Sequence, residues 1–353
     1  MRAIMNLGFA KGIEYRDNVP KPVPQPGEVL IKVKSSAICG TDVAMWKWTP
    51  GGEKWSRKYA LDKEQIFGHE FSGVIAELGE GVTGLKVGDR VSVETHLFCG
   101  TCYQCQHGDA HNCQNLVCYG SAYGGCFSDY ALSPAKQVFV LPDEISFEEA
   151  SLLEPACCAM FGIDEAHVQP GDVVMVYGCG AIGQMAIEIL YACGAKTVIA
   201  VDIDDYKCQL AEALGAVAVN SMKQDIGEVV KKYCSERGGV DAIIEISGAG
   251  SIYETMFDYL RAEGHVVLLA HPGAPVPIDM MKVHHKGATV KGAFGRRIWD
   301  SWHHLTKLMA EKKVDLLKVV THRFPLEKGL DAFEQTQIGA GKILILPEMQ
   351  VED

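Results

Sequence analysis

Apolar and polar positions alternate in two different ways along this chain, and the change falls near Pro170. Beyond that residue, short and nearly continuous apolar runs are separated by segments with helical periodicity. This pattern predicts strands at Val173–Tyr177, Thr197–Val201, Ala216–Val219, Ala242–Ile246 and His265–Leu269, and helices at Ala181–Cys193, Asp205–Leu214, near Gln224–Cys234 and at Ile252–Leu260. Apolar strands that alternate with helices of this length are typical of a parallel, doubly wound sheet. We therefore expect an α/β fold in this half.

The first 150 residues have a different pattern of short, β-branched segments separated by glycine and proline turns. The pattern predicts strands at Glu28–Val33, Ser72–Leu78 and Arg90–Glu94, in a small irregular β-barrel or sandwich. After about Thr289 the periodicity weakens to a helix at Ile298–Ala310 and a final strand at Gly341–Leu346, which we expect to rejoin the first half. The expected domains are residues 1–153, 154–291 and a returning segment 292–353.

Length and composition fit this organisation and narrow the class of partner. The chain has 353 residues, 48% of them hydrophobic and 22% charged, which is ordinary for a globular protein of two domains. A formal net charge of −12 argues against nucleic acid and anionic membranes as partners. No apolar run approaches the roughly 18 residues of a membrane span. With 13 cysteines and no export signal visible, we expect the reducing cytoplasm as the location.

The segment FCGTCYQCQHGDAHNC, residues 98–113, predicts a structural zinc site. Cys99, Cys102 and Cys105 are three residues apart, and Cys113 follows beyond a short loop. Four thiolates complete a tetrahedral zinc site, and this spacing lets neighbouring sulfurs turn toward one ion. The polar residues between the cysteines disfavour the alternative of four buried free thiols. A closed site of this kind stabilises a lobe (about residues 96–115) and carries no chemistry.

The segment VVMVYGCGAIGQMAIEIL, residues 173–190, predicts a dinucleotide site because its GxGxxG spacing follows a strand and opens a helix. The glycines permit the tight turn, the approach of a pyrophosphate and close packing of helix on strand. About 20 residues on, an aspartate ends the next expected strand, where it can accept both ribose hydroxyls of NAD and repel the 2′-phosphate of NADP. The candidate cofactor residues here are Gly178, Gly180, Ile182, Gly183, Asp202 and Lys207.

Two further fragments, Cys39-Gly40-Thr41-Asp42 and Gly68-His69-Glu70, complete a recognisable series of motifs. In this order with the cysteine cluster and GCGAIG, they resemble the zinc-dependent medium-chain alcohol dehydrogenase superfamily over essentially the whole chain. Finer features are similar to its threonine 3-dehydrogenase branch: WKWTPGGEKWSRK (46–58), SVETHLFCGTC (92–102), HNCQN (111–115), GCFSDY (125–130) and GAFGRRIWDSW (292–302). The resemblance implies a GroES-like β-barrel catalytic domain, a Rossmann domain that binds NAD, and a homodimer or homotetramer.

The resemblance also implies the reactive site. In the family, the catalytic zinc is held by residues that match Cys39, His69 and Glu70, and Glu154 matches an acidic residue that approaches the metal and exchanges with water or substrate. Residues that match Leu269, Ala270, His271, Ala293 and Phe294 line the nicotinamide half of the cofactor groove. The expected reaction is NAD-linked oxidation of a secondary alcohol to a ketone by hydride transfer, with zinc as Lewis acid. Thr41 is placed to carry the alcohol proton outward, unless it is only a turn residue at the end of a strand.

The sequence departs from the threonine 3-dehydrogenase pattern near the expected substrate chamber. Ala44 stands where that branch has a histidine that completes the proton relay, and Ala156–Met160 is more apolar than the branch's glycine- and asparagine-containing run. His96 matches the branch and either faces the substrate or lies on a surface loop. An amino alcohol such as L-threonine remains the first expectation for the small polar substrate. A polyol or sugar alcohol comes next, and a non-catalytic sensor that binds NAD(H) and zinc is the alternative from another class.

Overall fold

The chain forms two compact units in a computed structural model that describes residues 1–59, 63–121 and 123–350. Unit 1 comprises Met1–Glu154 and Val320–Asp353, and unit 2 comprises Pro155–Val319. The C-terminal segment does return to the first unit, but from residue 320 rather than from 292 as the sequence pattern suggested. The intervening helix at 300–310 therefore belongs to unit 2, because its packing and not its place in the sequence decides its domain.

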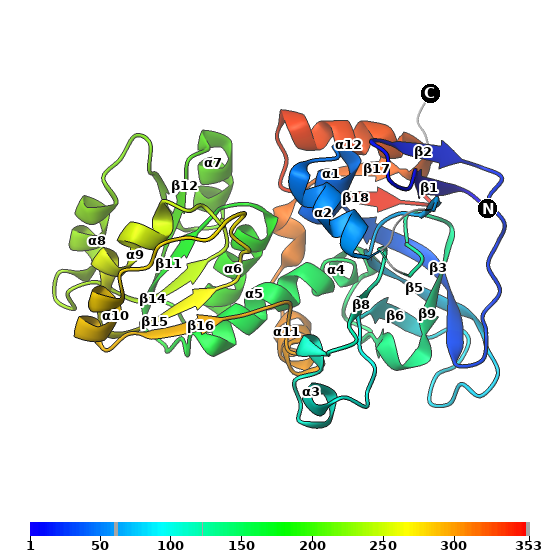
Figure 1. Cartoon of the computed structure of the whole chain (residues 1–353), viewed down its shortest axis with the longest axis horizontal. Helices are drawn as coiled ribbons and strands as arrows, with labels where there is room; N and C mark the ends of the chain where they lie inside the picture. Colours follow the sequence, from blue (N-terminus) through cyan, green and yellow to red (C-terminus); the bar gives the residue numbers. More distant parts are fainter. Residues whose placement is uncertain (60–62, 122, 351–353) are drawn as a thin grey trace. The chain divides into compact units, whose positions relative to one another are not determined.

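Unit 2 is built on a six-stranded parallel sheet with strand order β13-β12-β11-β14-β15-β16 (Figure 1). Its strands are β11 (Val173–Tyr177), β12 (Thr197–Asp202), β13 (Val217–Asn220), β14 (Val240–Glu245), β15 (Leu260–Leu268) and β16 (Thr289–Gly292). Its helices are α5 (Leu153–Glu165), which begins at the end of unit 1, and α6 (Ala181–Ala192), α7 (Asp205–Ala213), α8 (Ile226–Cys234), α9 (Ile252–Tyr259), α10 (Met280–Lys286) and α11 (Asp300–Ala310). This topology confirms the predicted α/β, doubly wound fold.

The central strand β11 shows why the sequence pattern is continuous rather than alternating. All five of its residues are buried. Val173, Met175 and Tyr177 face a core shared with α8 and α9, while Val176 lies on the other face, near Gly183 of α6. A strand covered by helices on both sides has no solvent face, so every position is apolar.

Unit 1 is mostly β structure and joins the two ends of the chain. Its strands are β1 (Ala3–Asn6), β2 (Ile13–Arg16), β3 (Glu28–Ala37), β4 (Gln65–Ile66), β5 (Glu70–Leu78), β6 (Arg90–Val93), β7 (His96–Leu97), β8 (Val117–Cys118), β9 (Tyr130–Pro134), β10 (Val138–Val140), β17 (Val320–Pro325) and β18 (Lys342–Leu346). A seven-stranded sheet runs β10-β6-β5-β3-β18-β17 with β9 on β3, beside a three-stranded sheet β2-β1-β4. In Figure 1 the red β18 therefore lies beside the blue β3.

Helices α1 (Gly40–Trp46), α2 (Pro50–Lys58), α3 (Tyr103–Gln106), α4 (Phe147–Ala150) and α12 (Gly329–Ile338) complete unit 1. The sequence pattern identified none of these, because each is short or lies between strands without a full amphipathic repeat. The described residues contain no helix with the length and apolar character needed to cross a membrane.

Candidate metal centres and cofactor site

The four cysteines of residues 98–113 form one cluster in unit 1, as the spacing predicted. The Sγ atom of Cys105 lies 3.9 Å from that of Cys99 and 3.5 Å from that of Cys102, and Cys102 Sγ lies 3.8 Å from Cys113 Sγ. A tetrahedral zinc with Zn–S bonds near 2.3 Å requires sulfurs roughly 3.8 Å apart. The four ligand atoms lie within 4.8 Å of one another, so this donor set fits zinc.

Local hydrogen bonds surround the sulfurs of Cys99 and Cys113. The hydroxyl and backbone N–H of Thr101 and the N–H of Cys102 all donate to Cys99 Sγ, and they lower the pKa of Cys99 to about 5. The N–H groups of Cys99 and Asn115 donate to Cys113 Sγ, both at 3.3 Å. Because a thiolate and not a thiol binds metal, the loop favours the ligating form at Cys99, whereas burial raises the pKa of Cys105 to about 12.

A second group of ligands, Cys39, His69 and Glu70, has its donor atoms within 4.8 Å of one another. Cys39 follows β3 and caps α1, while His69 immediately precedes β5. Strands β3 and β5 pair with Ala37 opposite Glu70, which brings the two fragments together across the sheet. A thiolate, an imidazole and a carboxylate supply only three donors, so this group could hold zinc with one position open for a ligand.

Asp42 orients two members of this group from the first turn of α1. Its Oδ1 lies 3.1 Å from His69 Nδ1, and its Oδ2 accepts the N–H of Cys39 at 3.0 Å. With Nδ1 engaged by the carboxylate, Nε2 is the nitrogen available to a metal. Burial lowers the pKa of His69, but Asp42 and Cys39 together raise it well above its ordinary value. The negative charges around His69 therefore favour a positive charge at this position.

Glu70 is fully buried and forms an ion pair with a lysine from the far end of the chain. Its Oε2 lies 2.5 Å from Lys342 Nζ in β18, and the lysine side chain is only 4% exposed. Glu70 Oε1 has no hydrogen-bond partner among the described residues, which leaves a buried oxygen that a metal would satisfy. Burial raises the pKa of Glu70, with the attraction of Lys342 opposing it and the negative charge of Glu154 adding to it.

Glu154 lies close to this group without being part of it. Its Oε1 accepts a hydrogen bond from the Thr95 hydroxyl at 2.6 Å, and the residue is buried. Thr41 is half-buried in the first turn of α1. The structure thus brings together Cys39, His69 and Glu70 of the four predicted ligands. The fourth, Glu154, is outside this group but near enough for its charge to raise the pKa of Glu70.

The glycine loop of unit 2 has the geometry that a pyrophosphate requires. Gly178 has a φ of +98°, which favours glycine, and a Cβ at Gly183 would lie 1.9 Å from the Gly178 carbonyl oxygen. A Cβ at Gly180 would meet nothing within 4 Å, so the N-terminus of α6 faces open space. Free N–H groups and the helix dipole make this space suitable for phosphate.

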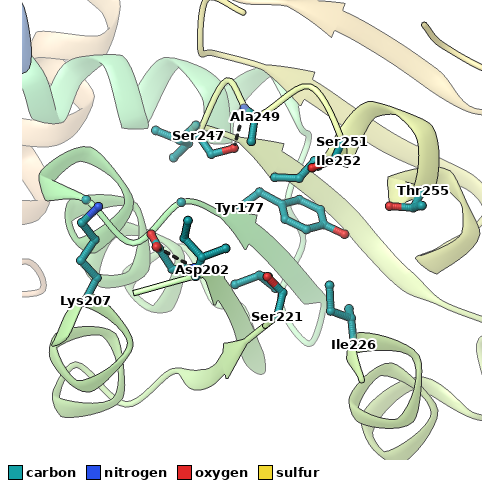
Figure 2. Close-up of a pocket in the computed structure, with 15 residues that line it drawn as sticks. Tyr177, Asp202, Lys207, Ser221, Ile226, Ser247, Ala249, Ser251, Ile252 and Thr255 are labelled. Atoms are coloured by element: carbon teal, nitrogen blue, oxygen red, sulfur yellow. Dashed lines mark hydrogen bonds between the residues drawn. The ribbon is translucent and has the colours of Figure 1, made fainter. Parts of the chain in front are cut away.

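Beside the loop, unit 2 contains a cavity of about 570 Å³ (Figure 2). We call it the unit 2 cavity; it is lined by Tyr177, Gly178, Gly180, Val201, Asp202, Ile203, Lys207, Ser221, Ile226, Ile246, Ser247, Ala249, Ser251, Ile252 and Thr255. Asp202 is held in place by the N–H of Cys179, which donates to its Oδ2 at 2.8 Å, and by the N–H of Ile203, which donates to its Oδ1. A fixed carboxylate at this wall suits the ribose hydroxyls of NAD.

Glu245, the last residue of β14, shapes one wall of this cavity. Its Oε1 accepts hydrogen bonds from Ser247 N–H, Ser247 Oγ and Gly248 N–H at 2.6–2.8 Å. Its Oε2 accepts from the Tyr253 hydroxyl at 2.8 Å, and its carbonyl oxygen accepts the N–H of Leu269. The side chain of this one buried residue therefore ties the loop after β14 to helix α9, and its backbone carbonyl ties the same strand end to the loop after β15.

The other predicted cofactor residues lie around the same edge of the sheet. Ile182 and Gly183 are in the first turn of α6, Leu269, Ala270 and His271 follow β15, and Ala293 and Phe294 follow β16. None of these seven is among the residues that line the unit 2 cavity in the described structure. The cavity therefore corresponds to the adenosine side of the expected groove, and the nicotinamide assignments stay predictions.

Comparisons with known proteins agree with this architecture. Residues 25–143 match the family model of the alcohol dehydrogenase GroES-like domain, and residues 181–311 match that of the zinc-binding dehydrogenases. The chain is 37% identical over 351 residues to an L-threonine 3-dehydrogenase of Bacillus subtilis strain 168, covering 98% of this chain and 99% of the relative.

Two solved structures resemble it along nearly their full length. The 2R,3R-butanediol dehydrogenase of Bacillus subtilis has a TM-score of 0.85 at 30% identity, over 98% of this chain and 99% of that one. An alcohol dehydrogenase from Escherichia coli CFT073, solved in complex with NADH, has a TM-score of 0.86 at 26% identity over the same shares.

The chain belongs to the zinc-dependent medium-chain alcohol dehydrogenase superfamily, with its GroES-like and Rossmann domains. Within that superfamily it falls in the threonine 3-dehydrogenase branch, and it is an NAD-linked, zinc-dependent oxidoreductase.

Three residues with clear positions in these sites were not identified from the sequence: Asp42 as the partner of His69, Lys342, and Glu245. A signal was present for two of them. Lys342 begins the segment KILIL, and Glu245 ends the segment VDAIIE. Both segments are expected to be buried, and a buried charged side chain requires a partner. Which partner each one finds depends on the packing of distant strands.

Proposed function

We propose that this enzyme oxidises the secondary hydroxyl of L-threonine to a ketone and transfers the hydride to NAD. The observation that carries the proposal is the 37% identity to an L-threonine 3-dehydrogenase over 98% of this chain. The branch-like segments at 92–102, 111–115, 125–130 and 292–302 support it.

In this proposal Cys39, His69 and Glu70 would hold the catalytic zinc, which would supply a Lewis acid for the substrate hydroxyl. Asp42 accepts a hydrogen bond from His69 Nδ1 and fixes the ring, and Lys342 holds Glu70 in place and balances its charge.

In this proposal Thr41 would accept the proton of the substrate hydroxyl, and Glu154 would lie beside the metal that Cys39, His69 and Glu70 would hold. The support for Glu154 is its position, held by the Thr95 hydroxyl and near enough to Glu70 to raise the pKa of that residue. Ala44 offers no proton acceptor, so in this chain the outward path from Thr41 continues through water or another group.

A polyol such as a vicinal diol is the second candidate substrate. Ala44 and the apolar run Ala156–Met160 depart from the sequence pattern of the threonine 3-dehydrogenases, which weakens the case for an amino acid. The similarity to a 2R,3R-butanediol dehydrogenase favours a diol as the specific alternative.

The deciding experiment measures NADH formation with the zinc-loaded enzyme against L-threonine, L-serine, 2,3-butanediol, sorbitol and other hexitols. The proposal requires the highest kcat/KM with L-threonine. A preference for butanediol or a hexitol assigns the polyol function instead. Binding of NADH without turnover of any alcohol in the panel identifies a non-catalytic sensor.

We also propose that the chain acts in the cytoplasm as a homodimer or homotetramer. Strand β16 ends the unit 2 sheet, and its four residues are exposed. An exposed edge strand can pair with the same strand of a second copy about a two-fold axis. Analytical ultracentrifugation tests this, since a Val290→Pro variant in β16 should shift the assembly toward monomer, whereas a monomeric wild-type protein contradicts the proposal.

A further inference from the structure

Tyr177 lines the unit 2 cavity and is unusual because its buried hydroxyl has no hydrogen-bond partner among the described residues. It is the last residue of β11 and directly precedes Gly178 of the glycine loop. Figure 2 shows its ring extending from the strand between Ser221 and Ile252, with the hydroxyl directed toward Ile226 and Thr255.

The side chain is buried, and its hydroxyl oxygen has no hydrogen-bond partner among the described residues. Two other tyrosines of unit 2 differ in this respect. The Tyr253 hydroxyl donates to Glu245, and the Tyr191 hydroxyl donates to the Gly215 carbonyl at 2.7 Å. Buried hydroxyls in folded proteins are almost always hydrogen-bonded, so an exception at a ligand cavity points to a partner on the ligand.

The part of the cofactor that reaches this hydroxyl follows from the other walls. The pyrophosphate belongs at Gly178 and Gly180, and the ribose at Asp202. Beyond the ribose, the remaining wall is formed largely by apolar side chains, among them Ile203, Ile226 and Ile252. A flat base with apolar faces and a polar edge fits this space, and adenine has ring nitrogens and an amino group along that edge.

We propose that the Tyr177 hydroxyl hydrogen-bonds to the polar edge of the adenine base and is a specificity-determining residue for the cofactor. The hydroxyl is covered by neighbouring atoms, so the contact includes a small turn of the ring within the cavity. Burial also raises the pKa of Tyr177, so the group stays protonated and can both donate and accept. The proposal rests on the NAD-linked activity and is independent of which alcohol is oxidised.

The test is calorimetric binding of ADP-ribose, which carries the adenosine half of the cofactor but no nicotinamide, to wild type and Tyr177→Phe. Loss of one hydrogen bond should weaken ADP-ribose binding about three- to tenfold. Binding of reduced nicotinamide mononucleotide, which has no adenine, should be the same in both proteins. The matched control is Tyr191→Phe, which removes a hydroxyl elsewhere in unit 2 and should leave both affinities unchanged.

Equal affinity of wild type and Tyr177→Phe for ADP-ribose would overturn the proposal, as would equal weakening of both ligands. Thermal unfolding without ligand provides a second measurement. A hydroxyl reserved for the base contributes nothing to the fold, so Tyr177→Phe should unfold at the same temperature as wild type or higher. A clear loss of thermal stability would instead assign the hydroxyl a structural role and contradict the proposal.

Discussion

The two metal centres of unit 1 are built in opposite ways. The cysteine cluster draws all its ligands from residues 99–113, and backbone N–H groups of the same loop donate to its sulfurs. The second centre takes Cys39 from the end of β3, His69 and Glu70 from the start of β5, and Lys342 from the last strand of the chain. The first is a property of one loop, whereas the second exists only when distant strands have paired.

The difference extends to charge and coordination. Four cysteines close the coordination of one ion, which suits a structural role. At the second centre, Glu70 is balanced by Lys342 and His69 is held by Asp42, so the three donors are fixed while a coordination position remains. A reactive metal needs such fixed ligands and an open position, and only long-range packing can provide both.

The largest expected effect comes from Cys39→Ser. Loss of a ligand at the open centre should reduce kcat at least about 10³-fold, since metal catalysis contributes several kcal/mol to the barrier. Elemental analysis should show one zinc per chain instead of two, with unchanged circular dichroism. Cys193→Ser, in unit 2 and outside both ligand groups, is the control. Full activity of Cys39→Ser would remove this centre from the mechanism.

Lys342→Met tests whether the second centre depends on its buried ion pair. Leaving the Glu70 charge without its partner should cost about 3–5 kcal/mol of unfolding free energy, measured by urea denaturation. Adding Glu70→Gln should restore part of that stability, because the uncompensated charge is then gone. Lys21→Met serves as the control, since its pair with Glu77 is exposed to solvent and should leave the unfolding free energy nearly unchanged. A Lys342→Met protein as stable as wild type would show that the pair is unimportant.

Cys102→Ser makes the same test at the local centre. Removing the cross-link of a loop of this length should cost about 3 kcal/mol, by analogy with a disulfide. We expect one zinc per chain and a lower midpoint of thermal unfolding, but nearly normal kcat at 25 °C, because the cluster carries no chemistry. A collapse of kcat comparable to that of Cys39→Ser would mean that the two centres are not separate in function.

The smallest effect is expected from Asp42→Asn, which keeps the shape of the side chain but removes its charge. Weaker support of His69 should lower zinc affinity at the open centre about 10- to 100-fold, measured by competition with a chelator. The cysteine cluster, which has no such carboxylate partner among the described residues, should keep its zinc at the same chelator concentration. Equal loss of both ions would contradict the role assigned to Asp42.

Sequence alone was enough wherever the determining interactions are local. The cysteine cluster, the glycine loop with Asp202, and strands β11 to β15 and β18 were predicted, with β11 at its predicted bounds, whereas strands β16 and β17 were missed. Helices α1, α2, α5 and α12 were missed because their stability comes from packing in the folded units and not from a repeat in their own residues. The last domain boundary was placed at 292 instead of 320 for the same reason.

The sequence by itself determined the family, the α/β fold and the cysteine cluster, because short motifs carry these through local geometry. The ligand set Cys39, His69 and Glu70 was implied only by the family resemblance. The tertiary structure alone decided that Lys342 pairs with Glu70, that Asp42 fixes His69, and that the Tyr177 hydroxyl lies at the unit 2 cavity with no hydrogen-bond partner among the described residues. Each of these depends on which distant side chains share a buried space. That outcome is set by strand pairing and packing across the whole unit, which no local pattern records.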